Sequence, residues 1–456
     1  MAGTERAKMR FWHEDAFIYH IYPLGACGAP PSFDKGGANR LPALERWIPH
    51  IKDMGCDAVL FCPVFESRSH GYDTTDYFRI DRRLGDNDGF RALVTALHGA
   101  GLRVVLDGVF NHCGRDFFAF RDVKEKRAAS PYAAWFSGID FSRDNAHHDG
   151  FSYDTWNGYE ELVKFNLGSE TSPACSEAME YLLGAAEFWI KHFGIDGLRL
   201  DAANSLSFGF MRDLRRRTEA LRPDFWLMGE VVAGDYAKWV NADTLHSVTN
   251  YVLYKGLYSS HNDENLFELA YTLTKQFGPS GPCLPLNSFL ENHDQNRLAS
   301  LVKRREYLYT LYILLFTVPG VPSLYYGGEW GVRGEKKDGS DAALRPYIDP
   351  TNAPVEEPAL APVIKKLAAI RKASEALRHG DYAQLSVKYR KPLVFERRHA
   401  SESVVVAVNP YAAPAEVTLP GLSGSFFDML NDEAVALDGR LSVPPYWGRV
   451  LRRERG

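Results

Sequence analysis

The chain has 456 residues, of which 45% are hydrophobic and 24% are charged, and its formal net charge is -5. This length and composition are typical of a soluble protein with one large domain and one or two small ones. The charge balance excludes the basic surface with which proteins bind nucleic acids or anionic membranes, so neither partner is expected.

The N-terminus and the cysteines predict a cytoplasmic protein. Residues 1–15 lack the apolar core of a secretory signal, and the longest apolar stretch, 308–318, is too short to cross a bilayer. The cysteines are dispersed, without a CxxC pair or metal-type spacing, and are expected to be free thiols in a reducing compartment. They are Cys27, Cys56, Cys62, Cys113, Cys175 and Cys283.

Runs of apolar, β-branched or aromatic residues recur along the chain with helix-like segments between them. The predicted strands are 17–22, 58–62, 103–110, 195–200, 225–228, 245–248, 286–290 and 321–325. The predicted helices are 41–54, 88–99, 176–193, 211–221, 266–277 and 304–316. This alternation predicts a parallel sheet, and eight strands predict an α/β fold of the (β/α)₈ TIM-barrel type.

Two regions interrupt the alternation. Residues 113–167 form an insertion after the third strand. It is too long for a simple connecting loop and is therefore expected to have a function. After Arg378, short alternating segments predict a small antiparallel β-domain; they are 383–387, 393–398, 403–408, 415–419 and 449–451. The predicted domains are 1–112 (first part of the barrel), 113–167 (insertion), 168–378 (second part of the barrel) and 379–456 (C-terminal β-domain).

Four short stretches each place a carboxylate, alone or with His or Arg, at or just after a predicted strand. They are DGVFNH (107–112), GLRLDAAN (197–204), LMGEVV (227–232) and FLENHD (289–294). A barrel delivers catalytic side chains from the C-terminal ends of several strands into one pocket. A single carboxylate at a strand end is more often a helix cap, but four in this order predict an active site.

The four stretches resemble the sequence regions of glycoside hydrolase family 13, the α-amylase family, and the resemblance covers nearly the whole chain. It implies a retaining enzyme whose nucleophile and acid/base carboxyls lie about 5–5.5 Å apart. It implies that Asp201 is the nucleophile, Glu230 the general acid/base and Asp294 a third carboxylate that holds sugar hydroxyls. Arg199 precedes Asp201 by two residues, so it faces the same side of the strand and is expected to lower the pKa of Asp201.

The resemblance also implies substrate-binding and supporting residues. His112 and His293 correspond to donors to the sugar, and Tyr72, in GYDTTDY (71–77), to the ring that stacks under it. Asp107 and Asn111 correspond to structural supports of the pocket. Asp73 and Arg297 occupy positions that pair in exo-acting relatives and cap the non-reducing end, although wider-specificity members also have this pair.

The insertion and the segment LVKFNLG (162–168) look most like the neopullulanase, cyclomaltodextrinase and maltogenic amylase group. Lys164 and Ser205 stand where many α-amylases have a calcium-binding Asp and His. Ca²⁺ prefers several oxygen ligands, so we expect no calcium there, no other metal and no cofactor. The group's N-terminal β-domain, which builds its dimer, is expected to be absent because the first strand begins near Phe17. The oligomeric state, monomer or homodimer, stays open.

The leading hypothesis is a retaining α-glucan hydrolase that acts on maltodextrins, cyclodextrins or related oligosaccharides. The alternative is a transglycosidase or isomerase, such as a glucanotransferase or disaccharide isomerase, because the same glycosyl-enzyme intermediate serves both. A non-catalytic carbohydrate-binding protein on this fold is disfavoured, because the chain keeps all three carboxylates. A phosphorylase is disfavoured because no basic cluster lies near the motifs.

Overall fold

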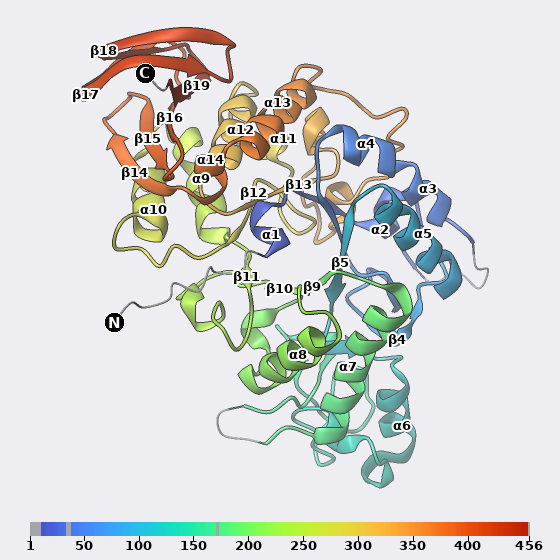
Figure 1. The fold of residues 1–456 in the computed structure, drawn as a ribbon. Helices are drawn as coiled ribbons and strands as arrows, with labels where there is room; N and C mark the ends of the chain where they lie inside the picture. Colours follow the sequence, from blue (N-terminus) through green and yellow to red (C-terminus); the bar gives the residue numbers. More distant parts are fainter. Residues whose placement is uncertain (1–10, 33–37, 170–172, 455–456) are drawn as a thin grey trace.

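The computed structural model describes residues 11–32, 38–169 and 173–454. Its centre is a barrel of eight parallel strands (Figure 1), so the predicted TIM barrel is confirmed. The strands are β1 (Ile18–Ile21), β2 (Ala58–Phe61), β5 (Arg103–Gly108), β9 (Gly197–Leu200), β10 (Trp226–Gly229), β11 (Ser247–Val248), β12 (Asn287–Phe289) and β13 (Val321–Tyr325). The ladder runs β11-β10-β9-β5-β2-β1-β13-β12, and a parallel bridge between Thr249 and Asn287 closes the ring.

Most of the helices lie around the barrel, whereas α1 (Trp12–Asp15) lies at its N-terminal end and α6 (Phe118–Lys126) in the region after β5. The others are α2 (Pro23–Ala26), α3 (Leu41–Glu45), α4 (Trp47–Asp53), α5 (Asn87–Gly99), α7 (Ser176–Phe188), α8 (Phe208–Leu221), α9 (Tyr251–Asn262), α10 (Phe267–Phe277), α11 (Leu298–Leu301), α12 (Tyr307–Thr317), α13 (Leu360–Ala373) and α14 (Glu375–His379). Asp86, Ser207 and Asn250 cap α5, α8 and α9 by accepting backbone N–H bonds.

Two predicted helices differ in the structure. The predicted helix 41–54 is divided into α3 and α4. Pro49 has no N–H to donate to the carbonyl four residues earlier, which weakens a continuous helix at this point. The predicted helix 176–193 ends in a π-helical turn, η3 (Trp189–Phe193), before the left-handed Gly194. Helices α9 and α13 were not predicted.

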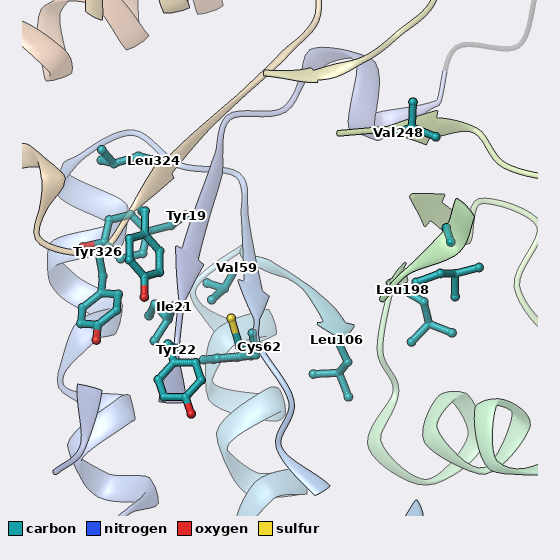
Figure 2. Close-up of a cluster of buried hydrophobic side chains, with 14 of the residues drawn as sticks. Tyr19, Ile21, Tyr22, Val59, Cys62, Leu106, Leu198, Val248, Leu324 and Tyr326 are labelled. Atoms are coloured by element: carbon teal, nitrogen blue, oxygen red, sulfur yellow. The ribbon is translucent and has the colours of Figure 1, made fainter. Parts of the chain in front are cut away.

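The interior of the barrel follows the two-residue period of its strands. Toward the N-terminal ends it is filled by an apolar cluster, against which Trp12 of α1 packs; the cluster includes Ile18, Ala58, Leu60, Val105, Trp226, Met228 and Val321. The alternate residues pack outward against the helices, as Tyr19, Val59, Leu106, Leu198 and Leu324 do (Figure 2). Toward the C-terminal ends of the strands and just beyond them, the inward-facing positions are His20, Asp107, Arg199, Asp201 and Glu230. The polar site therefore forms the upper layer of the barrel interior.

The region after β5 contains its own small sheet and an aromatic core. Its strands are β6 (His112–Gly114), β7 (Thr155–Trp156) and β8 (Tyr159–Lys164), in the order β6-β8-β7. His112 pairs with Lys164 across β6 and β8, which joins this region directly to the top of the barrel. A separate hairpin of β3 (Phe65–Ser67) and β4 (Thr74–Ile80) follows β2.

An antiparallel sheet forms the C-terminal part of the chain, as predicted. Its strands are β14 (Asp381–Ser386), β15 (Leu393–Arg398), β16 (Ser403–Asn409), β17 (Ala415–Asp428), β18 (Glu433–Val443) and β19 (Trp447–Arg453). The prediction missed β18 and the second half of β17. These two strands form a twisted ribbon with a register shift between Thr418 and Ser423, so their burial does not alternate regularly.

Within residues 11–32, 38–169 and 173–454, no helix has both the length and the apolar character needed to cross a membrane.

Candidate active site

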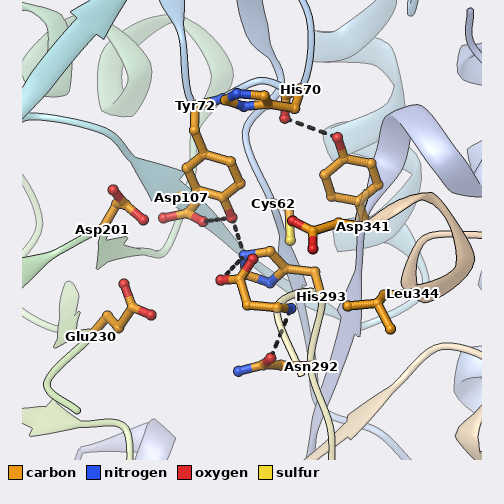
Figure 3. Close-up of polar contacts among 12 residues, drawn as sticks. Cys62, His70, Tyr72, Asp107, Asp201, Glu230, Asn292, His293, Asp341 and Leu344 are labelled. Atoms are coloured by element: carbon orange, nitrogen blue, oxygen red, sulfur yellow. Dashed lines mark hydrogen bonds and ion pairs between the residues drawn. The ribbon is translucent and has the colours of Figure 1, made fainter. Parts of the chain in front are cut away.

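The predicted site residues come from the upper ends of neighbouring barrel strands. Asp107 ends β5, Asp201 follows β9, Glu230 follows β10, and His293 lies in the loop after β12. Figure 3 shows these side chains around one pocket, with Asp201 and Glu230 on one side and His293 on the other. The four separate sequence stretches are thus brought together.

Arg199 is the centre of the carboxylate cluster. Its Nη1 lies 2.8 and 2.6 Å from the two carboxylate oxygens of Asp107 and 3.1 Å from Oδ1 of Asp201. Its Nη2 lies 2.9 Å from Oε2 of Glu230. One buried guanidinium therefore contacts three carboxylates, which its planar fork of donors allows and a lysine would not.

Arg199 acts to lower the pKa of Asp201, as expected, but it does not set the net shift. Burial raises the pKa of Asp201 well above its usual value, and Arg199 opposes this shift only in part because Glu230 and Asp107 add negative charge. Burial likewise raises the pKa of Asp107 against the effect of Arg199. Burial and the repulsion between neighbouring carboxylates thus both favour the protonated forms of Asp201 and Asp107, and the Arg199 guanidinium opposes them.

Glu230 is held by groups that the sequence analysis did not identify. Its Oε2 accepts a hydrogen bond of 3.1 Å from the backbone N–H of Ala202, whose φ of 46° is unusual for a residue other than glycine. Its Oε1 accepts a bond of 3.2 Å from the phenol of Tyr251, the first residue of α9. Asn292 in turn donates to the Tyr251 oxygen at 2.9 Å. These contacts fix the direction of the Glu230 carboxyl group.

His293, which is buried, and Asp294, which is half-buried, form an ion pair. Nε2 of His293 lies 2.9 Å from Oδ2 of Asp294. Although burial opposes the charged form, Asp294 raises the pKa of His293 to about 10. Burial also opposes ionisation of Asp294, but His293 and Arg345 bring its pKa well below the usual value. Arg345, which the sequence analysis missed, reaches Oδ1 of Asp294 with Nη2 at 2.9 Å and lies over the ring of Tyr22.

His112 keeps one ring nitrogen free toward the pocket. Nδ2 of Asn111 lies 3.2 Å from its Nδ1, while Nε2 is buried, has no hydrogen-bond partner among the described residues, and lies 4.0 Å from Oδ2 of Asp201. Burial lowers the pKa of His112 to about 3, so the ring is neutral. If the Asn111 amide donates to Nδ1, then Nε2 carries the proton and can donate it to a ligand. Trp156 of β7 stacks on the His112 ring at 5.4 Å.

Tyr72 completes the polar wall opposite Asp201 and Glu230. Its phenol donates to Oδ2 of Asp107 at 2.9 Å and lies 2.5 Å from Nε2 of His293. The rings of Tyr72 and His293 are nearly parallel, at 7°, with centroids 5.3 Å apart. The predicted sugar-stacking ring is therefore rigidly held by both sides of the pocket.

Comparison with known proteins agrees with this arrangement. Residues 34–356 match the model of the alpha amylase catalytic domain. The chain belongs to the alpha-amylase family. It is 31% identical to the cyclomaltodextrinase of Geobacillus thermopakistaniensis strain MAS1, with 96% of this chain and 77% of the relative covered. It is 30% identical to neopullulanase 2 of Thermoactinomyces vulgaris, with 96% and 78% covered.

Among solved structures, the chain resembles the ligand-free cyclic alpha-maltosyl-(1→6)-maltose hydrolase of Arthrobacter globiformis. The TM-score is 0.82 at 27% identity, and the match covers 98% of this chain and 100% of that one. The protein is therefore a glycoside hydrolase of the alpha-amylase family, and its substrate is a carbohydrate.

The predicted pairing of Asp73 with Arg297 is wrong. Arg297 is fully buried, donates to Glu291 and to the carbonyl of Tyr326, and stacks on the ring of Tyr325 at 4.2 Å. Asp73 instead accepts hydrogen bonds from the hydroxyl and backbone N–H of Ser69. Arg297 occupies the N-cap position of α11 but makes no side-chain capping bond. In this family member the arginine that reaches Asp294 is Arg345.

Lys164 and Ser205, which the sequence resemblance places where many α-amylases bind calcium, lie close together in the structure. Both line a cavity of about 520 Å³, together with Asn111 and Asp154. The insertion is tied to the barrel here by the β6–β8 pairing and by a bond from Phe165 N to the carbonyl of Asn111 at 3.1 Å. Backbone hydrogen bonds therefore join the insertion to the barrel at this cavity. The absence of calcium stays a prediction.

Proposed function

We propose that the protein cleaves α-glucosidic bonds in maltodextrins, cyclodextrins or related oligosaccharides with retention of configuration. The observation that carries this proposal is the contact of Arg199 with both Asp201 and Glu230. It fixes the predicted nucleophile and the predicted acid/base at the ends of adjacent strands, β9 and β10, on opposite sides of one guanidinium. Two carboxyl groups so held suit a two-step displacement.

In the first step, Glu230 donates its proton to the glycosidic oxygen, and a carboxylate oxygen of Asp201 forms a bond to the anomeric carbon as the leaving sugar departs. The product is a β-glycosyl ester on Asp201. In the second step, Glu230 takes a proton from a water molecule, whose oxygen attacks the anomeric carbon and releases Asp201. Both carboxyl groups return to their starting states, so the α configuration is retained.

The remaining residues hold the sugar in this mechanism. Nε2 of His112, free of any partner among the described residues, is placed to donate to a hydroxyl group near Asp201. The charged pair of His293 and Asp294 binds hydroxyl groups on the other side. Tyr72 supplies a flat ring against the sugar, since aromatic faces pack well against apolar faces of pyranose rings.

The names of the relatives support the substrate class. Two are named for cyclic sugars, as a cyclomaltodextrinase and a cyclic alpha-maltosyl-(1→6)-maltose hydrolase, and one is named a neopullulanase. A transglycosidase would use the same intermediate and differ only in the acceptor, a sugar in place of water. We also propose a cytoplasmic location, which is supported by the six free cysteines.

The test is a product profile with stereochemistry. Purified enzyme and an Asp201→Asn control are incubated with linear maltodextrins, cyclodextrins and pullulan; products are separated by anion-exchange chromatography, and the first anomer is read by proton NMR. Ring opening with release of maltose or glucose as the α anomer is expected, and only with the parent enzyme. Initial release of the β anomer would overturn the retaining mechanism, and longer or rearranged oligosaccharides as main products would favour the transglycosidase.

A further inference from the structure

Three side chains with metal-binding atoms meet below the candidate sugar pocket. His20 comes from β1, Cys62 follows β2, and His293 lies after β12. One ligand atom of each lies within 4.8 Å of those of the other two, and Nε2 of His20 is 3.1 Å from Sγ of Cys62. All three side chains are buried, and Figure 3 shows Cys62 beside the ring of His293. Within the described part of the chain this is the one such group of histidine, cysteine and carboxylate residues.

The catalytic arrangement leaves part of this cluster unused. Nε2 of His293 is engaged by Asp294 and Tyr72, whereas Nδ1 is buried and has no hydrogen-bond partner among the described residues. Buried polar atoms in native proteins nearly always have a partner, so an orphan nitrogen calls for an explanation. His293 can therefore bind a metal through Nδ1 beside a thiol and a second imidazole, but only by releasing the proton that its pair with Asp294 retains, so metal binding and this proton compete.

We propose that His20, Cys62 and His293 bind a thiophilic divalent cation of the Zn²⁺ type, and that its binding inhibits the enzyme. A thiolate with two imidazoles is a donor set that zinc uses, and it does not suit Mg²⁺ or Ca²⁺. With Zn–N bonds of about 2.0–2.1 Å and a Zn–S bond of about 2.3 Å, tetrahedral ligand atoms lie about 3.3–3.6 Å apart. The observed separations, 3.1 Å and up to 4.8 Å, need only small side-chain movements.

Inhibition follows from the position of the cluster. His293 forms the ion pair with Asp294 and contacts Tyr72. An ion bound to the His293 ring therefore disturbs all three side chains that are proposed to bind the sugar. A doubly charged ion below the pocket also alters the field around the carboxylates. The fourth coordination position is left for water or a sugar hydroxyl. Because Asp294 is the most exposed of these groups, the ion enters from the substrate side, and bound oligosaccharide should protect the site.

Metal binding is tested first without any assay of activity. Protein freed of metal with EDTA is titrated with Co²⁺, a spectroscopic substitute for Zn²⁺. One equivalent should produce a thiolate-to-cobalt absorption band, and Zn²⁺ should abolish it. Cys62→Ser should lose the band, and His20→Gln should weaken binding at least about tenfold, a change of about 1.4 kcal/mol. Cys283→Ser, which removes the exposed cysteine, is the matched control and should titrate like the parent.

Inhibition is tested separately, and this readout rests on the proposed function. Zn²⁺ should inhibit the parent and Cys283→Ser equally, whereas Cys62→Ser and His20→Gln, each compared with its own metal-free rate, should need at least about ten times more Zn²⁺. Maltotriose bound to Asp201→Asn should slow formation of the cobalt band. Absence of a stoichiometric band in the parent, or a parental titration by Cys62→Ser, would overturn the site. A normal band in a protein without glycosidase activity would instead overturn the proposed function.

Discussion

Arg199 lies between the two carboxyl groups that the proposed reaction needs, with Nη1 3.1 Å from Oδ1 of Asp201 and Nη2 2.9 Å from Oε2 of Glu230. The same guanidinium also holds Asp107, so the position of the whole cluster depends on one side chain. Because the three carboxylates lie on different strand ends, this residue links β5, β9 and the residue after β10.

Replacing Arg199 with Lys should therefore impair catalysis although the charge is kept. An ammonium cannot reach all three carboxylates at once, and loss of a hydrogen bond to a charged group costs about 1.5–3 kcal/mol. This corresponds to a fall in kcat/KM of about 10- to 150-fold. Steady-state kinetics on maltotriose would measure it. Arg217→Lys, which changes a surface arginine paired with Glu180, is the control and should retain parental kinetics.

The roles of Asp201 and Glu230 can be separated with a substrate that needs no acid. Fluoride leaves α-maltosyl fluoride without full protonation. Glu230→Gln should therefore keep most of its rate of glycosyl transfer from this substrate, whereas its rate on maltotriose should fall about 100- to 10,000-fold. Asp201→Asn should lose activity on both, because it cannot form the ester. Burst measurements of fluoride release would show this. Equal losses on both substrates in Glu230→Gln would contradict its assignment as the acid.

The strands that carry these residues could be predicted because each is a short, fully buried run that ends in a charged residue. GLRLD and VVLDG show this pattern, and their register places Arg199 beside Asp107 in the barrel. That the candidate carboxylates lie at the ends of neighbouring barrel strands could therefore be predicted from the sequence. The sign of the Asp201 pKa shift could not, because it depends on how fully the pocket is buried.

The residues that the sequence analysis missed act through contacts between distant parts of the chain. Tyr251 is 21 residues from Glu230, and Arg345 is 51 from Asp294, so no local spacing indicates either contact. Arg297 is the opposite case: the family resemblance implied that it pairs with Asp73, but its side chain lies in the core against Glu291. Sequence spacing predicts which side chains share a strand face, not where a loop turns.

Tyr251 should affect the proton transfers of Glu230 but not the departure of a leaving group that needs no acid. Its hydrogen bond to Oε1 orients the carboxyl group, and a bond of this kind contributes about 0.5–1.5 kcal/mol. Tyr251→Phe should lower kcat on maltotriose about 2- to 12-fold and leave the rate on α-maltosyl fluoride nearly unchanged. Tyr254→Phe, one turn further along α9 and also buried, is the matched control. A similar loss on both substrates would indicate a packing role instead.

The His293–Asp294 pair predicts a pH dependence of stability. The pKa of His293 is raised from 6.5 to about 10, so the folded state retains a proton that the unfolded chain loses first. Its contribution to stability is complete below pH 6.5 and is lost as the pH rises through about 10. The difference in melting temperature between the parent and His293→Gln should therefore shrink steadily over this range. A difference that stays constant to pH 10 would show that the ring is not charged in the fold.

Calcium should have no effect on stability, because the cationic Lys164 lines the cavity that would have to hold the ion. A site filled at 100 times its dissociation constant would stabilise the fold by about 2.7 kcal/mol, which shifts a melting temperature measurably. Scanning calorimetry with EDTA and with excess Ca²⁺ should give the same transition for the parent. Lys164→Asp removes the cation and adds a carboxylate beside Asn111 and Asp154, so this variant should gain a calcium-dependent shift. A shift already present in the parent would show that backbone and amide oxygens suffice to bind the ion despite the lysine.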